Sequence, residues 1–233
     1  MKCRIAQLNI EFINRGKHFE GLAEKYRAEF SSPELTVRAT DEEIEAEKRA
    51  AAYPMRNSVA ETVVFSRNFA HMLPEYDAFM LHSATFSLRG RGIGFLAKSG
   101  TGKSTHMFSW KELFGDELEI INGDKPVIRF EDGLPYAYGT PWCGKEGYSK
   151  NERVVLTDIC FITRSDKNET VRLHENDEIA HRLLGQVSIP AGSENIIKTL
   201  ELVERLVNSC RFWEISCTAD KSSAEISSSI ILR

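Results

Sequence analysis

The chain has 233 residues, of which 42% are hydrophobic and 27% charged, and its formal net charge at pH 7 is −4. These values are typical of a folded globular protein. They argue against a disordered or coiled-coil chain and against a broad nucleic-acid-binding face. No apolar run approaches the roughly 18 residues of a membrane-spanning helix, and the first twelve residues lack the apolar core and cleavage site of a secretion signal. We therefore expect no nucleic-acid partner and no membrane partner.

Five cysteines are present, at positions 3, 143, 160, 210 and 217. Their odd number and the lack of a C-x-x-C pair fit neither a disulfide framework nor a zinc site. Unpaired thiols are typical of a reducing compartment, so the sequence predicts a cytoplasmic protein.

Residues 1–75 are expected to form an accessory segment that mixes helices and strands. The capping-box pair Thr40 and Glu43 marks the start of one helix, and Pro54 lies just beyond its end. The expected elements are a β-like stretch over 5–12, a helix over 18–29, a short strand over 35–37, and helices over 41–52 and 56–72.

Residues 76–233 are expected to form the larger, nucleotide-binding unit. Alternating apolar residues predict a strand over 79–88, and RGRG then turns the chain into a second strand over 93–97. The further expected elements are a helix over 103–114, a strand over 118–121, a hairpin over 127–139, a loop over 139–151, a strand over 154–163, helices over 175–185 and 194–209, a strand over 211–217, and a short helix after Asp220.

Residues 97–105 read AKSGTGKST and match the phosphate-binding loop G-x-x-x-x-G-K-[ST], except that Ala97 replaces the first glycine. Glycines in such a loop let backbone N–H groups point at phosphate oxygens, and the following helix adds the positive end of its dipole. Lys103 is expected to reach the β- and γ-phosphates, and the Ser104 hydroxyl to ligate Mg²⁺. The expected nucleotide-contacting residues are Ser99, Gly100, Thr101, Gly102, Lys103, Ser104 and Thr105.

A glycine-rich turn before a helix is the alternative reading of this motif. The context favours the nucleotide site, because an apolar strand precedes the loop and a second apolar strand leads to Asp124. We expect that second strand to neighbour the loop strand, which makes Asp124 a candidate metal ligand or catalytic base. A carboxylate that merely begins a turn before Lys125 and Pro126 is the alternative.

The segments FMLHSATFSLRGRGIGFLAKSGTGKST and LEIINGDKPV resemble the HPr kinase/phosphorylase family and, more broadly, the phosphoenolpyruvate-carboxykinase type of P-loop fold. The blocks YGTPWCGKEGYSKN and VVLTDICFI look like a subfamily of small HPr-kinase-related proteins. The resemblance covers about residues 60–165. It implies an α/β fold, with a P-loop core of the HPr kinase/phosphoenolpyruvate carboxykinase type and an N-terminal α+β lead-in.

The same resemblance implies a function and the roles of several residues. ATP and Mg²⁺ would be the cofactors, and the reaction would transfer a phosphoryl group to a hydroxyl acceptor, either a protein or peptide serine or a small metabolite. Lys103 and Ser104 would contact ATP and metal, His82 would lie near the phosphates, and Asp124 would be metal ligand or base. The family usually has two consecutive acids after the strand, whereas this chain has Gly123 and Asp124.

The loop 139–151 holds two further candidates for substrate contacts, Lys145 for an anionic group and Trp142 as a pocket wall; the alternative is a solvated loop with Trp142 anchored in the core. Cys143 has no recognisable activating partner, which argues against a covalent role. A carboxykinase-like lyase and a nucleotide-binding regulator without turnover stay open as other functions. The sequence identifies neither the acceptor nor the preferred base, and it leaves a homo-oligomer open.

Overall fold

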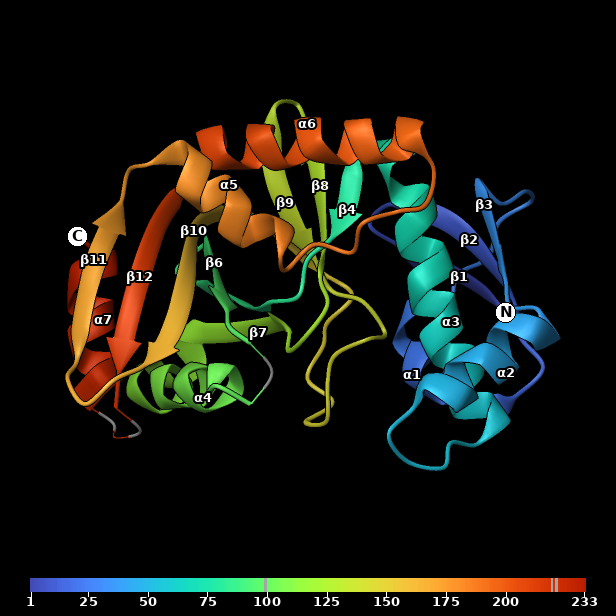
Figure 1. The fold of residues 1–233 in the computed structure, drawn as a ribbon, viewed down its shortest axis with the longest axis horizontal. Helices are drawn as coiled ribbons and strands as arrows, with labels where there is room; N and C mark the ends of the chain where they lie inside the picture. Colours follow the sequence, from blue (N-terminus) through green and yellow to red (C-terminus); the bar gives the residue numbers. More distant parts are fainter. Residues whose placement is uncertain (99, 219, 221) are drawn as a thin grey trace.

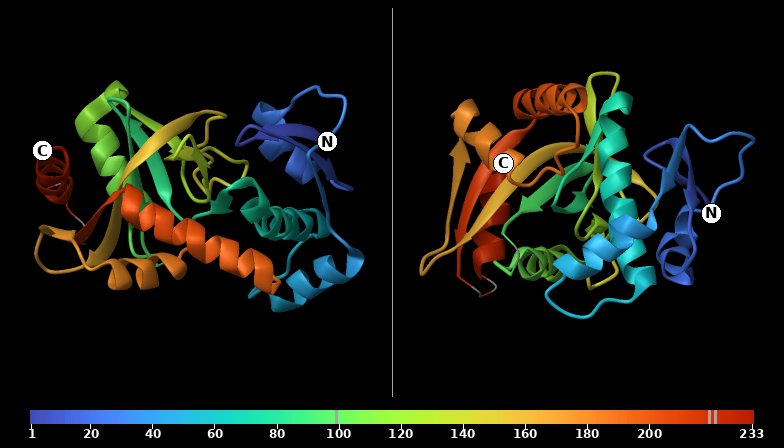
Figure 2. Two further views of the ribbon diagram at one scale, coloured as in Figure 1. Left: turned by 90° about the horizontal axis from the view of Figure 1, so that it is seen from above. Right: turned by 45° about the vertical axis from the view of Figure 1, so that its right-hand side comes forward.

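The structure is a computed structural model, and it describes residues 1–98, 100–218, 220 and 222–233. Its strands form a three-stranded sheet near the N-terminus and a nine-stranded sheet in the remainder of the chain. In Figures 1 and 2 the N-terminal elements and the C-terminal helix lie at opposite ends of the molecule. No helix among the described residues is both long enough and apolar enough to cross a membrane.

The N-terminal sheet has the order β1-β2-β3, with β1 and β2 antiparallel and β2 and β3 parallel. Its strands and the helices packed beside them are β1 (Lys2–Ile5), β2 (Leu8–Ile13), α1 (Lys17–Ala23), β3 (Leu35–Arg38), α2 (Asp41–Ala50) and α3 (Asn57–Met72). The predicted stretch over 5–12 is a hairpin, because Ala6 and Gln7 both adopt positive φ and reverse the chain. The helix predicted over 18–29 ends early, at Ala23. The capping box is confirmed: the Glu43 amide donates to Thr40 Oγ1 at 3.2 Å.

The larger sheet has the order β4-β8-β9-β10-β6-β5-β7, and β12 and β11 extend it from β10. Its strands are β4 (Ala78–Met80), β5 (Ala84–Leu88), β6 (Arg91–Leu96), β7 (Leu118–Asn122), β8 (Val127–Glu131), β9 (Leu134–Tyr138), β10 (Arg153–Arg164), β11 (Glu169–Leu173) and β12 (Arg211–Cys217). The helices are α4 (Lys103–Phe114), α5 (Asn176–Leu184), α6 (Ser193–Ser209) and α7 (Ser222–Ile231). The sequence missed β11, and the single strand expected over 79–88 is two strands, β4 and β5, with a break between them.

Successive side chains along β10 point to opposite faces of this sheet, and both faces are buried. Ile159 and Phe161 belong to the apolar cluster under α5 and α6, whereas Cys160 and Ile162 belong to the cluster under α4 and α7. A third cluster joins the N-terminal sheet and α3 to β4, β8 and β9. The N-terminal segment and the larger unit therefore share a continuous apolar contact.

The strand order places β5 between β6 and β7. Both β6 and β7 pair with β5 in the antiparallel sense, so they run parallel to each other without being neighbours. The expectation that the strand before Asp124 adjoins the loop strand is therefore wrong. Asp124 and the loop are nevertheless expected at the same edge of the sheet, because strands that run parallel end at the same edge. The loop after β6, the residues before β5 and the residues after β7 all meet at that edge.

A buried carboxylate fastens the C-terminal helix to the sheet. Asp158 on β10 is fully buried, and it accepts a hydrogen bond from Trp213 Nε1 at 2.9 Å. Its oxygens also lie 3.0 Å from Arg91 Nη2 and 2.8 Å from Arg211 Nη2. Both guanidinium groups donate to the Ile231 carbonyl at the end of α7. Burial raises the pKa of Asp158, which the hydrogen bonds from Trp213 and Thr157 oppose.

We expect Asp158→Asn to lower the free energy of unfolding by about 2 kcal/mol, because the two half-exposed arginines lose their counter-charge and one buried acceptor becomes a donor. Urea unfolding measures the change, with the exposed Asp166→Asn as the matched control. An unchanged urea midpoint would mean that the arginines hold α7 without Asp158.

His106 lies at the contact between α4 and α7 and is 4% exposed. Its Nε2 is 3.1 Å from Ser227 Oγ and its Nδ1 is 3.3 Å from Ser223 Oγ. Burial lowers the pKa of His106 from 6.5 to about 4, because the imidazolium form loses its hydration. The folded state therefore holds the neutral ring, and below pH 6.5 the unfolded chain binds the proton first.

The unfolding free energy is expected to fall by about 2 kcal/mol more in the parent than in His106→Gln when the pH drops from 7 to 5. The unfolded chain takes up the proton as the pH falls through 6.5 and the folded state only as it falls through about 4, so the loss of stability develops mainly between these two pKa values. Urea titrations of both proteins at the two pH values give the difference. Equal losses in the two proteins would contradict the lowered pKa.

Candidate functional site

The loop between β6 and α4 has the backbone that its glycines predict. Gly100 has φ of 79° and Gly102, the N-cap of α4, has φ of 121°, a region that side chains with a β-carbon rarely adopt. Lys103 is the first residue of α4 and is 9% exposed. Ser99, which the motif places on the nucleotide, lies outside the described residues.

Arg164 at the end of β10 holds this loop, and the sequence analysis missed it. Its Nη2 donates to the Gly100 carbonyl at 2.6 Å and its Nε to the Thr101 carbonyl at 3.0 Å. Because β10 pairs with β6 in parallel, the end of β10 lies beside the loop. The loop carbonyls thus have a partner, and a permanent positive charge lies next to the expected phosphates. In the sequence, the signal that could have indicated this role is a charged residue at the end of an apolar strand.

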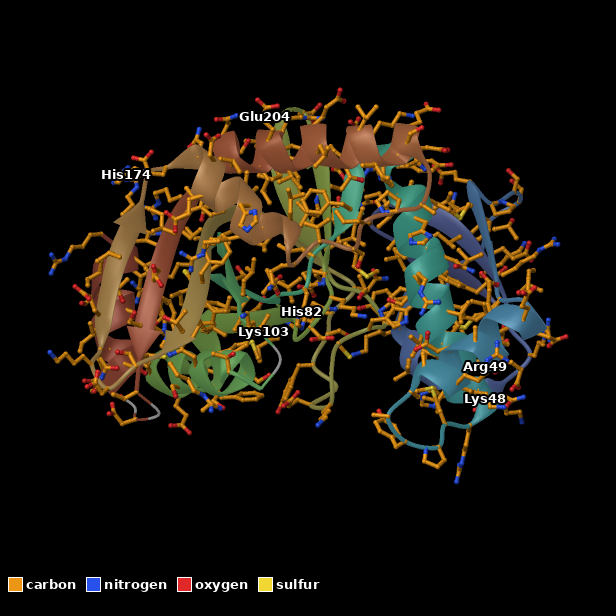
Figure 3. All side chains as sticks on the ribbon, in the orientation of Figure 1. Lys48, Arg49, His82, Lys103, His174 and Glu204 are labelled. Carbon is orange, nitrogen blue, oxygen red and sulfur yellow. The ribbon has the colours of Figure 1, made fainter. Side chains whose placement is uncertain are left out.

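Three polar side chains, those of His82, Lys103 and Asp124, meet beside the loop, and Figure 3 labels the first two. Asp124 Oδ1 lies 3.2 Å from Lys103 Nζ and 3.1 Å from His82 Nε2. Burial alone would raise the pKa of Asp124, but the hydrogen bond from His82 and the charge of Lys103 outweigh it and lower the pKa to about 2. Burial lowers the pKa of Lys103, while Asp124 opposes this shift. Asp124 is therefore ionised at neutral pH and accepts protons poorly, which favours a charge-stabilising or metal-binding role over that of a base.

His82 reaches Asp124 from the break between β4 and β5, within the stretch that was expected to be a single strand. Its amide donates to the Gln186 carbonyl at 2.8 Å, and the next amide, of Ser83, donates to the Asp124 carbonyl at 2.9 Å. The break thus pairs the chain before β5 with the chain after β7. This pairing brings the imidazole to the carboxylate.

Asn122 sets the backbone turn that presents Asp124, and it is a second residue that the sequence analysis missed. Its Oδ1 accepts from the amides of Asp124 at 2.9 Å and Lys125 at 2.8 Å. Its Nδ2 donates to the Thr140 carbonyl at 3.0 Å. The side chain is fully buried, and its bond to Thr140 is formed away from water. Asparagine at the end of a strand is a typical signal of such a turn.

The loop over 139–151 is anchored by Trp142, which lies in the apolar core. The indole Nε1 donates to the Thr62 carbonyl on α3 at 3.0 Å, and the ring stacks on Phe69 with centroids 5.7 Å apart. The core-anchored alternative for Trp142 is therefore what the structure shows. Lys145, the other candidate from this loop, is exposed to solvent.

Gly123 has no side chain because the loop backbone fills its place. A β-carbon on Gly123 would lie 2.7 Å from the Cys143 carbonyl oxygen, which is closer than atoms in contact approach. The Gly123 amide also donates to the Tyr148 carbonyl at 2.9 Å. A second acid directly before Asp124 would displace this loop, which is the physical reason for the glycine.

The oxygen donors of the site fit Mg²⁺. This cation prefers carboxylate and hydroxyl oxygens, keeps several waters, and is usually shared between one or two side chains and the substrate phosphates. Ser104 and Asp124 offer such oxygens on neighbouring elements. Within the described part of the chain, no group of three or more histidine, cysteine, aspartate or glutamate side chains is placed to hold a metal ion.

Two cavities border the loop, one on each side of Thr101 and Arg164. The larger, of about 830 Å³, opens toward α5, and lysine, arginine and histidine side chains are among the described residues of its lining. The smaller, of about 310 Å³, opens toward α7 and includes Thr105 and Asp220. Thr105, an expected nucleotide contact, is thus accessible from the smaller cavity.

Comparison with models of known protein families finds no match, and no curated protein sequence matches the chain. Among solved structures, the chain is similar to the HPr(Ser) kinase/phosphatase from Coxiella burnetii, with 11% sequence identity and a TM-score of 0.28. The similarity covers 55% of this chain and 90% of that protein. A TM-score this low carries no argument about shared chemistry, so the function is argued from the site itself.

Proposed function

We propose that the protein is an ATP- and Mg²⁺-dependent phosphotransferase that acts on a hydroxyl acceptor. The observation that carries the proposal is the meeting of Lys103 and Asp124, 3.2 Å apart, at the mouth of a loop with two left-handed glycines. A lysine that opens a helix and a carboxylate after a parallel strand are the two charged parts that phosphoryl transfer requires. The proposed partners are a nucleotide and the hydroxyl acceptor, which is a protein or peptide serine or a small metabolite. The proposed location is the cytoplasm, and the proposal includes association into a homo-oligomer.

Under this proposal, each residue of the site has a physical role. Amides of Gly100 to Ser104 bind the phosphates, and Lys103 moves from Asp124 to the β- and γ-phosphates, where it offsets the developing negative charge. Ser104 and Asp124 would hold Mg²⁺, which when bound neutralises phosphate charge. His82 keeps Asp124 oriented and ionised, and Lys145 would attract an anionic substrate from the loop rim. Catalysis by this set is positioning and charge stabilisation.

A nucleotide-binding regulator without turnover is the second candidate. The observation in its favour is Gly123, where the Cys143 carbonyl leaves no space for a side chain. The family that the sequence resembles usually has a second acid at this position. In this case the site would bind nucleotide and change the exposed part of the loop, residues 144–148, but transfer no phosphoryl group.

One assay separates these functions. The protein is incubated with ATP and Mg²⁺, alone and with serine peptides, polyols or oxaloacetate, and ADP and phosphorylated products are measured against the Lys103→Ala variant. Acceptor-dependent ADP formation above the variant supports the phosphotransferase. Phosphoenolpyruvate formed from oxaloacetate would instead indicate a lyase. Nucleotide binding with an ADP rate equal to that of the variant would favour the regulator.

A further inference from the structure

The larger of the two cavities lies between the phosphate-binding loop, the end of β10 and the last turn of α5. Its volume of about 830 Å³ is in the range of cavities that bind small molecules. Leu96 and Phe161 supply apolar surface to its lining, and Gly100 and Thr101 supply the edge of the loop. A molecule bound in this cavity would therefore lie against the loop that is expected to hold the phosphates.

The charged side chains around this cavity are cationic. Lys98 from the loop, Arg164 from the end of β10 and Arg182 from α5 all belong to its lining. The described residues of the lining include no carboxylate. Lys98 is exposed to solvent, so its ammonium group is accessible to a ligand. An anionic molecule is therefore attracted to this cavity more strongly than a neutral one.

Arg182 is held in a fixed position on the wall of the cavity. Its Nη1 lies 3.3 Å from Glu214 Oε2 on β12 and 3.3 Å from Glu178 Oε1, one turn earlier on α5. Its guanidinium carbon lies 4.2 Å from the centre of the Phe161 ring. Both ion pairs use Nη1, so the guanidinium group has further N–H donors for an anion. Because the two glutamates offset its charge, the excess positive charge comes from the loop and from the end of β10.

Gln186 connects the cavity with the charged centre around Asp124. It belongs to the lining of the cavity, and its carbonyl accepts the 2.8 Å hydrogen bond from the amide of His82. The side-chain oxygen Oε1 of Gln186 is buried and has no hydrogen-bond partner among the described residues. A buried amide oxygen without a partner is costly and uncommon in folded proteins. A hydroxyl group of a bound molecule would supply the missing donor.

We propose that this cavity binds the phosphoryl acceptor, and that the acceptor is a small alcohol that carries a phosphate or carboxylate group. The proposal rests on the proposed function and names the class of its substrate. Lys98 and Arg182 contact the anionic group, and Gln186 Oε1 accepts a hydrogen bond from a hydroxyl of the same molecule. In the transfer, the acceptor oxygen bonds to the γ-phosphorus while the bond from that phosphorus to the bridging oxygen of ADP breaks, and the hydroxyl proton passes to solvent.

Calorimetric titration of glycerophosphate and of glycerate into protein saturated with ADP and Mg²⁺ tests the proposal. ADP fills the phosphate-binding loop, so the two anions report on the cavity. In the parent we expect saturable binding of the anions and none of glycerol at the same concentration, because glycerol carries no charge. Lys98→Gln and Arg182→Gln should each weaken anion binding by about tenfold or more, the scale of a lost charge-assisted hydrogen bond.

Arg205→Gln is the matched control for Arg182→Gln. Arg205 on α6 also pairs with an acid, Asp77 at 3.1 Å, and its guanidinium carbon also lies 4.2 Å from the centre of a phenylalanine ring, that of Phe130. It lines a different cavity, so this variant should bind the anions as the parent does. Equal melting temperatures of unliganded parent and variants establish that the fold is retained. If Arg182→Gln does not fold, the exposed Lys98→Gln decides the test alone.

The outcomes separate this inference from the proposed function. Parent protein that binds ADP but neither anion would overturn the inference and leave the nucleotide site intact. Anion affinity within twofold of the parent in either folded variant would also overturn it, and so would anion binding that occurs only without ADP. A serine peptide flanked by aspartates that binds where both small anions fail would identify a peptide acceptor instead. Parent protein that binds no ADP would overturn the proposed function itself.

Discussion

Asp124→Asn is expected to lower phosphoryl transfer by at least about a hundredfold, the scale lost with a key electrostatic group. Asparagine keeps the size of the side chain, but it removes the charge that Lys103 and His82 both contact through one oxygen, at 3.2 and 3.1 Å. Nucleotide binding should persist in weakened form, because the loop amides and Lys103 remain. ADP affinity and turnover are measured on the same preparation.

Asp132→Asn provides the control for this substitution. Asp132 lies in the two-residue turn between β8 and β9 with φ of 49°, a conformation that asparagine also tolerates. We expect the control to match the parent in both measurements. Turnover of Asp124→Asn within a few-fold of the parent would assign the transfer step to another acid, and Asp124 would no longer be a candidate.

Lys103→Ala is expected to abolish most of the stabilisation by nucleotide. A ligand that binds only the native state stabilises it by about 2.7 kcal/mol at a hundredfold excess over Kd, so ATP or ADP with Mg²⁺ should raise the melting temperature of the parent. In the variant, the phosphates lose their main cationic partner at the start of α4. The quantity compared is the shift caused by ligand, so any change in the unliganded melting temperature cancels.

Lys48→Ala on α2, far from the loop in Figure 3, is the matched control and should keep the full shift. A ligand-induced shift in Lys103→Ala equal to that of the parent would mean that nucleotide binds elsewhere on the chain.

Local patterns predicted most elements of the larger unit. The Gly-containing turn after Leu88 and the Asp132–Gly133 turn both gave hairpins where they were expected, because two-residue turns with positive φ fix the register of their strands. The start of α4 at Lys103 and its end before Gly115 were also expected. These features depend on residues that are close together in the sequence, so they can be predicted from one sequence alone.

The contacts that make the site could not be predicted in the same way. Arg164 reaches the loop only because β10 pairs with β6, and His82 reaches Asp124 only because β5 lies between β6 and β7. Asn122 binds Thr140, eighteen residues away, inside the core. The glycine at 123 looked like a lost acid, whereas the structure shows that it makes room for the Cys143 carbonyl. Pairing between distant segments decides each of these positions.

Hydrogen exchange of the backbone amides, with and without ADP and Mg²⁺, tests most directly that the loop over 97–105 is a nucleotide site. We predict that saturating nucleotide slows exchange of peptides covering this loop and the first turn of α4, and to a smaller extent of those covering Asp124. Peptides of the N-terminal sheet should exchange at unchanged rates. Slowed exchange confined to another part of the chain, or none anywhere at saturating nucleotide, would contradict the account.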